Sequence, residues 1–324
     1  MSTAVGRRAA APRRLGSSRV EVSALSLGCA AFGNLYTEVS DEASTQTLRT
    51  ALDLGVRYAD VAPFYGFGLA EQRVGAALAG VPRADFVLST KVGRLLRPGA
   101  GPALDAVFDF TADGIRRSVE ESLTRLGLDR VDILYIHDPD EHLEQAITEA
   151  YPAAHQLRAE GVVGAIGAGM NFSAPLTRFV RETDIDAVLC AGRYTLLDQS
   201  ALSDLLPAAV QRNVSIVIGG VYNSGVLADP RPGARYDYEH APDAIVARAQ
   251  RLAAVCRGYG VPLKAAAVQF PFGHPAIATV LTGARSAAEI TENVAMFEHP
   301  IPTALWHELV EAGLLPADSV QLLI

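Results

Sequence analysis

The sequence predicts an α/β fold in which eight parallel strands alternate with helices and close into a (β/α)8 TIM barrel. Eight short, nearly continuous apolar runs recur along the 324 residues, which is typical of strands buried on both faces. Segments with apolar residues at helical spacing separate these runs. No Gly-x-Gly-x-x-Gly fingerprint follows the first run and no linker interrupts the even spacing, so one barrel is favoured over an open doubly wound sheet.

The predicted elements follow one another in chain order. Short β-type runs at 14–15 and 20–22 predict an N-terminal β-hairpin that closes the floor of the barrel. Thr111 is the expected N-cap of a helix whose apolar stripe begins at Ile115, and a C-terminal helical extension is expected at 302–315. The eight barrel strands are expected at 25–31, 56–61, 86–92, 131–137, 162–167, 187–191, 214–221 and 277–282.

A single domain is expected at residues 14–324, preceded by a flexible leader at residues 1–13. A chain of 324 residues fits either two domains or one barrel of about 250 residues with extensions. The regular alternation of strands and helices favours the barrel. The leader is rich in alanine and arginine but lacks the apolar stretch of a secretory signal, so we expect a cytoplasmic enzyme.

Composition excludes several classes of function. The formal charge of −8 disfavours a nucleic-acid surface, and no apolar run approaches the roughly 20 residues of a membrane-spanning helix. Three well-separated cysteines indicate no disulfide framework. We expect no metal site at 137–142, because Pro139 prevents helical pairing of the surrounding His and carboxylate groups. The expected partner is therefore a small molecule, and the oligomeric state stays open.

Four polar residues stand at or just after the ends of three successive predicted strands. Asp60 lies near the end of the second strand and Tyr65 just after it, while Lys91 and His137 lie at the ends of the third and the fourth. The carboxyl ends of barrel strands meet at one face, so these side chains are expected to share one cleft.

Their chemistry points to proton transfer at an alcohol oxygen. A tyrosine has an ordinary pKa of about 10, which a neighbouring ammonium lowers, and a carboxylate can hold that ammonium in place. Such proton transfer contributes about 10²–10⁴ in rate. No strong nucleophile stands beside a base, which disfavours acyl transfer.

The residues that carry this chemistry lie in segments that resemble the aldo-keto reductase superfamily, from about residue 14 onward. The matching segments are 55–66, Glu71-x-Arg73, Ser89-Thr90-Lys91, Asp132-x₄-His137, 281–286 and Glu292-Asn293. The resemblance implies a barrel that binds a nicotinamide dinucleotide without a Rossmann motif. It also implies that Tyr65 is the catalytic acid or base, supported by Asp60, Lys91 and His137.

Within the superfamily, the segments 28–36, 136–140, 166–171 and 191–199 resemble the bacterial aldose 1-dehydrogenase branch, with its D-threo-aldose, L-fucose and L-galactose enzymes. This resemblance implies oxidation of a cyclic hemiacetal at C1 to a lactone, with hydride transfer to NAD(P)⁺. A second interpretation is an NADPH-dependent aldehyde or ketone reductase that uses the same residues in reverse. A third is a cofactor-sensing binding protein similar to potassium-channel β subunits, but four intact catalytic positions favour turnover.

The resemblance also implies a set of cofactor contacts. The usual nicotinamide-stacking tyrosine would fall near Gly219, and the usual carboxamide-binding glutamine near Ala191, so Asn171 is the clearer candidate for the carboxamide. The implied cofactor-binding residues are Gly28, Asp60, Asn171, Ser224, Gly225, Gly283, Arg285, Glu289 and Asn293.

Charge favours NAD over NADP. Glu289 occupies a position where many family members place an arginine. A carboxylate about 4 Å from a 2′-phosphate would cost several kcal/mol at an effective dielectric of about 20, whereas a ribose 2′-hydroxyl can donate to it. Arg285 could offset this repulsion, so NADP is the alternative.

Overall fold

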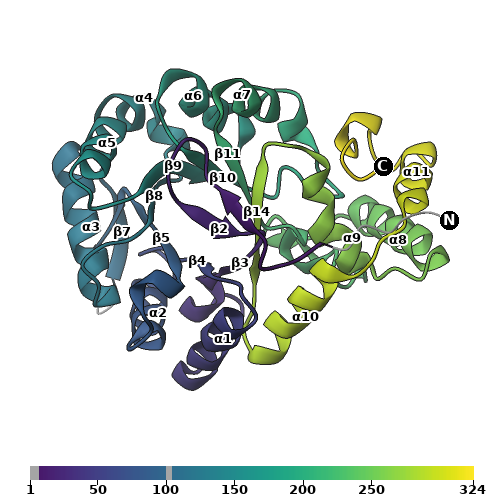
Figure 1. The fold of residues 1–324 in the computed structure, drawn as a ribbon, viewed down its shortest axis with the longest axis horizontal. Helices are drawn as coiled ribbons and strands as arrows, with labels where there is room; N and C mark the ends of the chain where they lie inside the picture. The colour runs from purple at the N-terminus through teal and green to yellow at the C-terminus, as the bar shows by residue number, and fades with distance from the viewer. Residues whose placement is uncertain (1–6, 100–103) are drawn as a thin grey trace.

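Eight parallel strands form a closed barrel surrounded by helices in the computed structural model, which describes residues 7–99 and 104–324 (Figure 1). The order around the barrel is β10-β11-β14-β3-β4-β5-β8-β9. Each predicted strand segment overlaps one barrel strand, so the predicted fold is confirmed. These strands are β3 (Leu25–Gly28), β4 (Tyr58–Asp60), β5 (Val87–Val92), β8 (Ile133–His137), β9 (Ala165–Met170), β10 (Ala187–Ala191), β11 (Ser215–Gly219) and β14 (Ile277–Gly283).

Helices pack around the outside of the barrel, and their apolar faces cover the strands. Short hairpins supplement them: β1 (Pro12–Arg14) with β2 (Glu21–Ser23), β6 (Arg94–Pro98) with β7 (Leu104–Phe108), and β12 (Arg235–Tyr236) with β13 (Glu239–His240). The helices are α1 (Asp41–Asp53), α2 (Leu69–Leu78), α3 (Ala112–Leu126), α4 (Leu143–Gln145), α5 (Tyr151–Ala159), α6 (Ser173–Glu182), α7 (Leu205–Arg212), α8 (Asp243–Gly258), α9 (Leu263–Gln269), α10 (Ala287–Glu298) and α11 (Thr303–Glu311).

Helix α3 shows how local sequence sets an element's limits. The Thr111 side chain accepts a hydrogen bond from the Gly114 amide at 3.1 Å, which confirms the predicted N-cap. Gly127 ends the helix in the left-handed conformation, with φ at 64°. Ile115 and Val119 are buried and face the barrel, as the apolar stripe predicts.

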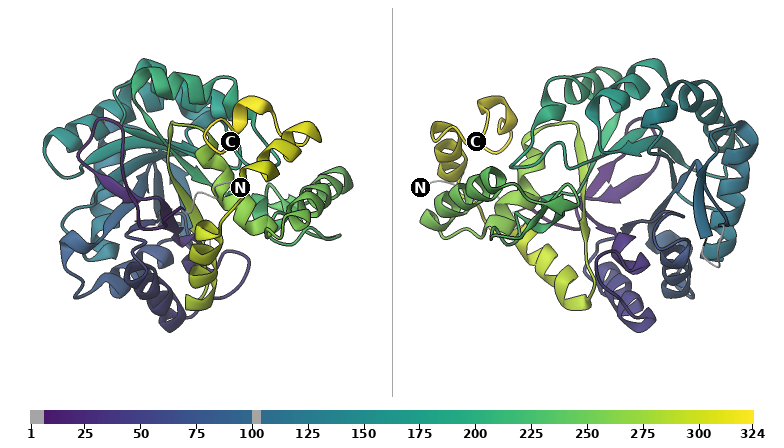
Figure 2. Two further views of the ribbon diagram at one scale, coloured as in Figure 1. Left: turned by 45° about the vertical axis from the view of Figure 1, so that its right-hand side comes forward. Right: turned by 180° about the vertical axis from the view of Figure 1, so that it is seen from behind.

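A second apolar cluster fills the inside of the barrel. Leu15 and Val22 of the N-terminal hairpin region pack there against Tyr58 and Tyr135, which are fully buried. The hairpin therefore closes the floor of the barrel, and its strand β2 crosses the barrel opening in Figure 1. The C-terminal helix α11 packs on α8 at one side of the molecule (Figure 2), which confirms the predicted helical extension.

The start of the chain differs from the predicted leader. Strand β1 begins at Pro12, and Ala9 is fully buried with its amide donating to Glu298 of α10 at 2.9 Å. A Cβ on Gly55 would lie only 2.6 Å from the Cβ of Ala10, so the absence of a side chain at Gly55 makes room for this segment. The segment is held by contacts with residues distant in the sequence, which local composition does not reveal. Residues 1–6 lie outside the described residues.

Within the part of the chain that the structure describes, no helix is both long and apolar enough to span a bilayer.

Candidate active site

The four predicted catalytic side chains meet at the carboxyl ends of neighbouring strands. Asp60 is the last residue of β4, Lys91 lies in β5 and His137 ends β8. These strands are neighbours in the barrel, and Tyr65 lies in the turn after β4. The structure therefore brings together all four residues that the sequence places at one cleft.

The Lys91 ammonium joins the acidic and phenolic groups. Its Nζ lies 2.7 Å from Asp60 Oδ2 and 3.0 Å from the Tyr65 hydroxyl, and it donates to the Val61 carbonyl at 3.1 Å. Lys91 and Asp60 are only 2% and 3% exposed, so water screens their attraction little. The ammonium thus fixes the position of the Tyr65 oxygen.

A contact between two glycines sets the position of the Tyr65 turn. A Cβ on Gly33 would lie 2.4 Å from the Tyr65 carbonyl carbon and 2.5 Å from the Gly66 nitrogen. Gly66 itself has a φ of +63°, a conformation that favours glycine. The loop after β3 can therefore rest directly on the backbone that carries Tyr65.

Burial and charge act in opposite directions on Tyr65. Burial raises the pKa of Tyr65 to about 12, although the Lys91 ammonium acts to lower it. The sequence predicts the effect of Lys91 correctly, but the loss of solvation is larger. Tyr65 is therefore a protonated phenol at neutral pH.

His137 faces Tyr65 as a neutral imidazole. The two ring centroids are 6.1 Å apart and the rings are perpendicular. Burial, and then the positive charges of Lys91 and Arg94, hold the pKa of His137 well below its usual value. A neutral imidazole can donate one hydrogen bond to an oxygen in the cleft.

A buried chain of hydrogen bonds lies below Asp60, and the sequence does not predict it. The Ser89 hydroxyl donates to Asp60 Oδ1 at 2.6 Å, and it lies 3.0 Å from the Tyr58 hydroxyl, which is 3.3 Å from that of Tyr135. Ser89 fixes the carboxylate oxygen that Lys91 leaves free. One feature of the sequence indicates this chain: Tyr58 and Asp60 are two residues apart in a strand, so their side chains point to the same face of β4.

A cavity of about 410 Å³ lies beside this group, and its lining includes Asp60 and Tyr65. Asn293 does not line it, but donates to the Gly283 carbonyl at 3.1 Å and so supports the wall. The predicted cofactor residues that line the cavity are Gly28, Asp60, Asn171, Ser224, Gly225, Gly283, Arg285 and Glu289.

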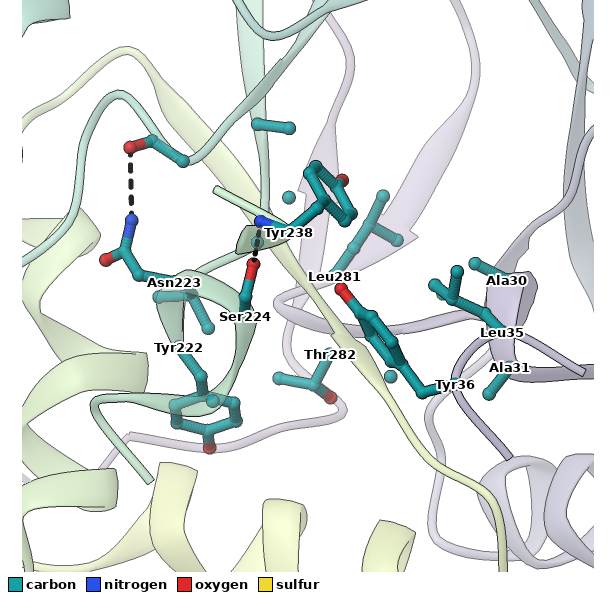
Figure 3. Close-up of a pocket in the computed structure, with 18 of the residues that line it drawn as sticks. Ala30, Ala31, Leu35, Tyr36, Tyr222, Asn223, Ser224, Tyr238, Leu281 and Thr282 are labelled. Carbon is teal, nitrogen blue, oxygen red and sulfur yellow. Dashed lines mark hydrogen bonds between the residues drawn. The ribbon is translucent and has the colours of Figure 1, made fainter. Parts of the chain in front are cut away.

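Tyrosines from two loops line the cavity beside the predicted catalytic and cofactor residues. Tyr36 comes from the loop after β3, and Tyr222 and Tyr238 come from the long connection after β11 (Figure 3). The Tyr238 amide donates to the Ser224 hydroxyl at 3.0 Å, which ties this connection to the cavity wall. Loop conformation decides which aromatic side chains reach the cavity, so their sequence positions alone do not identify them.

Arg285 and Glu289 form an ion pair at the edge of the cavity. Arg285 Nη2 lies 2.7 Å from Glu289 Oε1, and the Arg285 amide donates to Glu289 Oε2 at 2.8 Å. Burial favours the neutral acid, but the hydrogen bonds and charge of Arg285 lower the pKa of Glu289. Glu289 is therefore an ionised carboxylate, and it is paired with the Arg285 guanidinium.

The barrel and its group of Asp, Tyr, Lys and His define the class of protein. The model of the Aldo/keto reductase family matches residues 24–313, and the chain belongs to this family. It is an oxidoreductase that acts on CH–OH or carbonyl groups, a family in which NAD(P) is the expected cofactor.

Individual relatives refine this placement. The chain is 46% identical to a D-threo-aldose 1-dehydrogenase of Pseudomonas sp, over 91% of this chain and 95% of that protein. It is 40% identical to a pyridoxal 4-dehydrogenase of Microbacterium luteolum, over 95% and 99% of the two chains. An aldo-keto reductase from Bacillus halodurans, solved in its holo form, is similar in structure, with a TM-score of 0.76 and 27% identity over 94% and 96% of the chains.

Proposed function

We propose that this protein oxidises an aldose at C1 to its lactone, with NAD⁺ as hydride acceptor. The observation that carries the proposal is the Tyr65 hydroxyl, held 3.0 Å from the buried Lys91 ammonium beside the cavity. The similarity to D-threo-aldose 1-dehydrogenase supports a sugar as the substrate.

The cavity lining fits a nicotinamide dinucleotide. A Cβ on Gly225 or Gly283 would meet no atom within 4 Å, so these glycines leave the backbone of the wall open to the cavity. Arg285 supplies a cation, and Asn171 supplies an amide that suits a carboxamide. When bound, the dinucleotide supplies the hydride acceptor.

The catalytic residues of the chain handle the proton. In its phenolate form, Tyr65 takes the proton of the C1 hydroxyl as the C1 hydrogen leaves with its electron pair. Lys91 stabilises the negative charge on the phenolic oxygen, and Asp60 holds Lys91 within 2.7 Å. Neutral His137 donates a hydrogen bond to the C1 oxygen and orients it.

An aldose panel tests the substrate. Purified protein is mixed with L-fucose, L-galactose or D-arabinose and NAD⁺, and reduced nicotinamide is followed by absorbance. We expect turnover of at least one aldose, with the lactone identified by mass spectrometry. Absence of turnover with every aldose, together with reduction of aldehydes by NADPH, would overturn the proposal.

Carbonyl reduction is the second candidate, and the protonation of Tyr65 favours it. A phenol with a pKa of about 12 carries the proton that a carbonyl oxygen must receive. The same panel separates the two functions when oxidation and reduction are measured at one pH with both cofactors.

The Arg285–Glu289 pair supports the preference for NAD. A 2′-phosphate would have to displace an ionised carboxylate from Arg285, whereas a 2′-hydroxyl can donate to that carboxylate. We expect Glu289→Arg to raise the ratio of kcat/KM with NADP to that with NAD at least about tenfold. A tenfold change in this ratio corresponds to a free-energy difference of about 1.4 kcal/mol.

The matched control is Glu120→Arg, which makes the same charge change at an exposed position of α3. This control should leave the cofactor ratio unchanged. An unchanged ratio in Glu289→Arg would show that Glu289 does not face the 2′ position.

A further inference from the structure

Arg94 begins the β6–β7 hairpin directly after the strand that carries Lys91, and neither the catalytic group nor the cofactor cavity includes it. Gly93 makes the turn between the two strands with a φ of +97°, and a Cβ there would lie 2.2 Å from the Phe110 ring. The turn therefore requires glycine, and it brings Arg94 back toward the catalytic cleft. The Arg94 side chain is only 15% exposed.

The Arg94 guanidinium contacts both the turn that carries Tyr65 and the loop that follows His137. Its central carbon lies 4.5 Å from the ring centroid of Phe64, the residue before Tyr65, and 4.8 Å from that of Phe108. Phe108 is its register partner on β7. Its Nη2 donates to Asp138, the residue after His137. One side chain thus links the neighbours of two catalytic residues that lie 72 positions apart, since 137 − 65 = 72.

The Asp138 backbone needs such support. Its φ of +42° lies in the left-handed region, which costs a residue with a Cβ about 1 kcal/mol or more. The Asp138 amide donates to the Gly169 carbonyl at 2.9 Å, and Arg94 holds the carboxylate. In this conformation Asp138 Oδ2 lies 3.6 Å from His137 Nε2.

We propose that Arg94 is a positioning residue, which ties the Tyr65 loop to the His137 loop through Phe64 and Asp138 and so sets the geometry of proton transfer. The proposal rests on the proposed oxidoreductase chemistry of Tyr65. It assigns a role to the β6–β7 hairpin, which holds Phe108 against the guanidinium.

The arrangement has an electrostatic consequence for His137. The charged or titratable groups around its ring are Lys91 of β5, Arg94 of β6, Asp138 of its own loop and Tyr65 of the turn after β4. The two cations favour the neutral imidazole, whereas the Asp138 carboxylate favours the protonated one. Removal of Arg94 withdraws one cation and frees Asp138, and both changes raise the pKa of His137.

The test compares kcat, KM and pH profiles of Arg94→Met, Asp138→Asn and the double variant. We expect Arg94→Met to lower kcat about 10- to 100-fold, the size of effect that a small misplacement of catalytic groups produces. We also expect the acidic limb of its kcat/KM profile to move to higher pH by at least about half a unit. In the double variant we expect the acidic limb to return toward its wild-type pH, because the Asp138 carboxylate that raises the pKa of His137 is gone. We expect kcat to stay low, because the Arg94 link between the two loops is still missing.

Two further variants separate this role from a general structural one. Arg97→Met removes the same charge from the same hairpin, where Arg97 pairs with Glu121 at 2.9 Å, and it should keep wild-type kcat and pH profile. Arg94→Lys keeps the charge but not the planar stacking, so it should restore the pH limb more fully than kcat. If Arg94→Met does not fold, Arg94→Lys and Asp138→Asn must each lower kcat.

Three results would overturn the proposal: a wild-type kcat in Arg94→Met, an equal loss in Arg97→Met, or an acidic limb that does not move. The measurements use whichever reaction the wild-type protein catalyses. Absence of aldose oxidation would contradict the proposed function, whereas the role of Arg94 would then be decided on aldehyde reduction.

Discussion

Replacement of Lys91 by methionine removes the charge at the centre of the proposed catalytic group while keeping a side chain of similar length. Three contacts disappear, to Asp60 at 2.7 Å, to Tyr65 at 3.0 Å and to the Val61 carbonyl at 3.1 Å. Asp60 keeps only its bond from Ser89, at 2.6 Å. The variant therefore leaves a carboxylate that is 3% exposed without an opposite charge.

The expected loss is large because the remaining charge is buried. Removing one partner of a buried ion pair costs about 3–5 kcal/mol in the free energy of unfolding, out of about 5–15 kcal/mol for a typical protein. The double variant Asp60→Asn with Lys91→Met has no buried charge at this position. We expect it to be more stable than Lys91→Met alone, although neither variant turns over substrate at a measurable fraction of the wild-type rate.

Urea-induced unfolding measures this effect. Far-UV circular dichroism follows the whole chain, and the fluorescence of Trp306, the one tryptophan, follows its buried environment in α11. Coincident transitions justify a two-state treatment, and linear extrapolation then gives the free energies. A Lys91→Met variant as stable as the wild type, or a double variant less stable than the single one, would refute the reasoning.

Three further outcomes are expected. Tyr65→Phe should lower kcat at least about 10²–10⁴-fold while dinucleotide binding, measured by calorimetry, persists; an active variant would contradict the role of Tyr65. Because the pKa of Tyr65 is about 12 and that of His137 is lowered, the logarithm of the oxidation rate should rise from pH 7 to pH 10, and a falling profile would count against Tyr65 as the base. Thr111→Ala removes the bond to the Gly114 amide and should cost about 1 kcal/mol of stability by urea titration; an unchanged midpoint would mean that this cap contributes nothing.

The sequence predicts the barrel and the proximity of the four polar side chains at its carboxyl end well, because both depend on local patterns. Strand β5 begins with apolar residues and has Lys91 near its end, and the position at a strand end likewise locates Asp60 and His137. The role of Ser89 is not predicted in this way, because it depends on the strand register that places Ser89 beside Asp60, 29 positions earlier.

Features that depend on distant contacts are the ones the sequence does not predict. Ala9 is held by Glu298, which lies 289 positions away, so nothing near Ala9 indicates that it is buried. Arg94 likewise acquires its contacts from a turn that Gly93 permits and from Asp138, 44 positions later. Asp60, Tyr65, Lys91 and His137 could be inferred one by one, whereas the contacts of Ser89 and Arg94 that support them could not.

The closed floor of the barrel has a consequence for the timing of proton release. Below Asp60 the interior is filled by Tyr58 and Tyr135, and below these by Leu15 and Val22, all fully or almost fully buried. In the described part of the chain, a proton taken up by Tyr65 thus finds packed side chains beneath it and the ligand cavity beside it. We therefore expect the proton to exchange with bulk water through this cavity, so that Tyr65 returns to the phenolate as the product leaves.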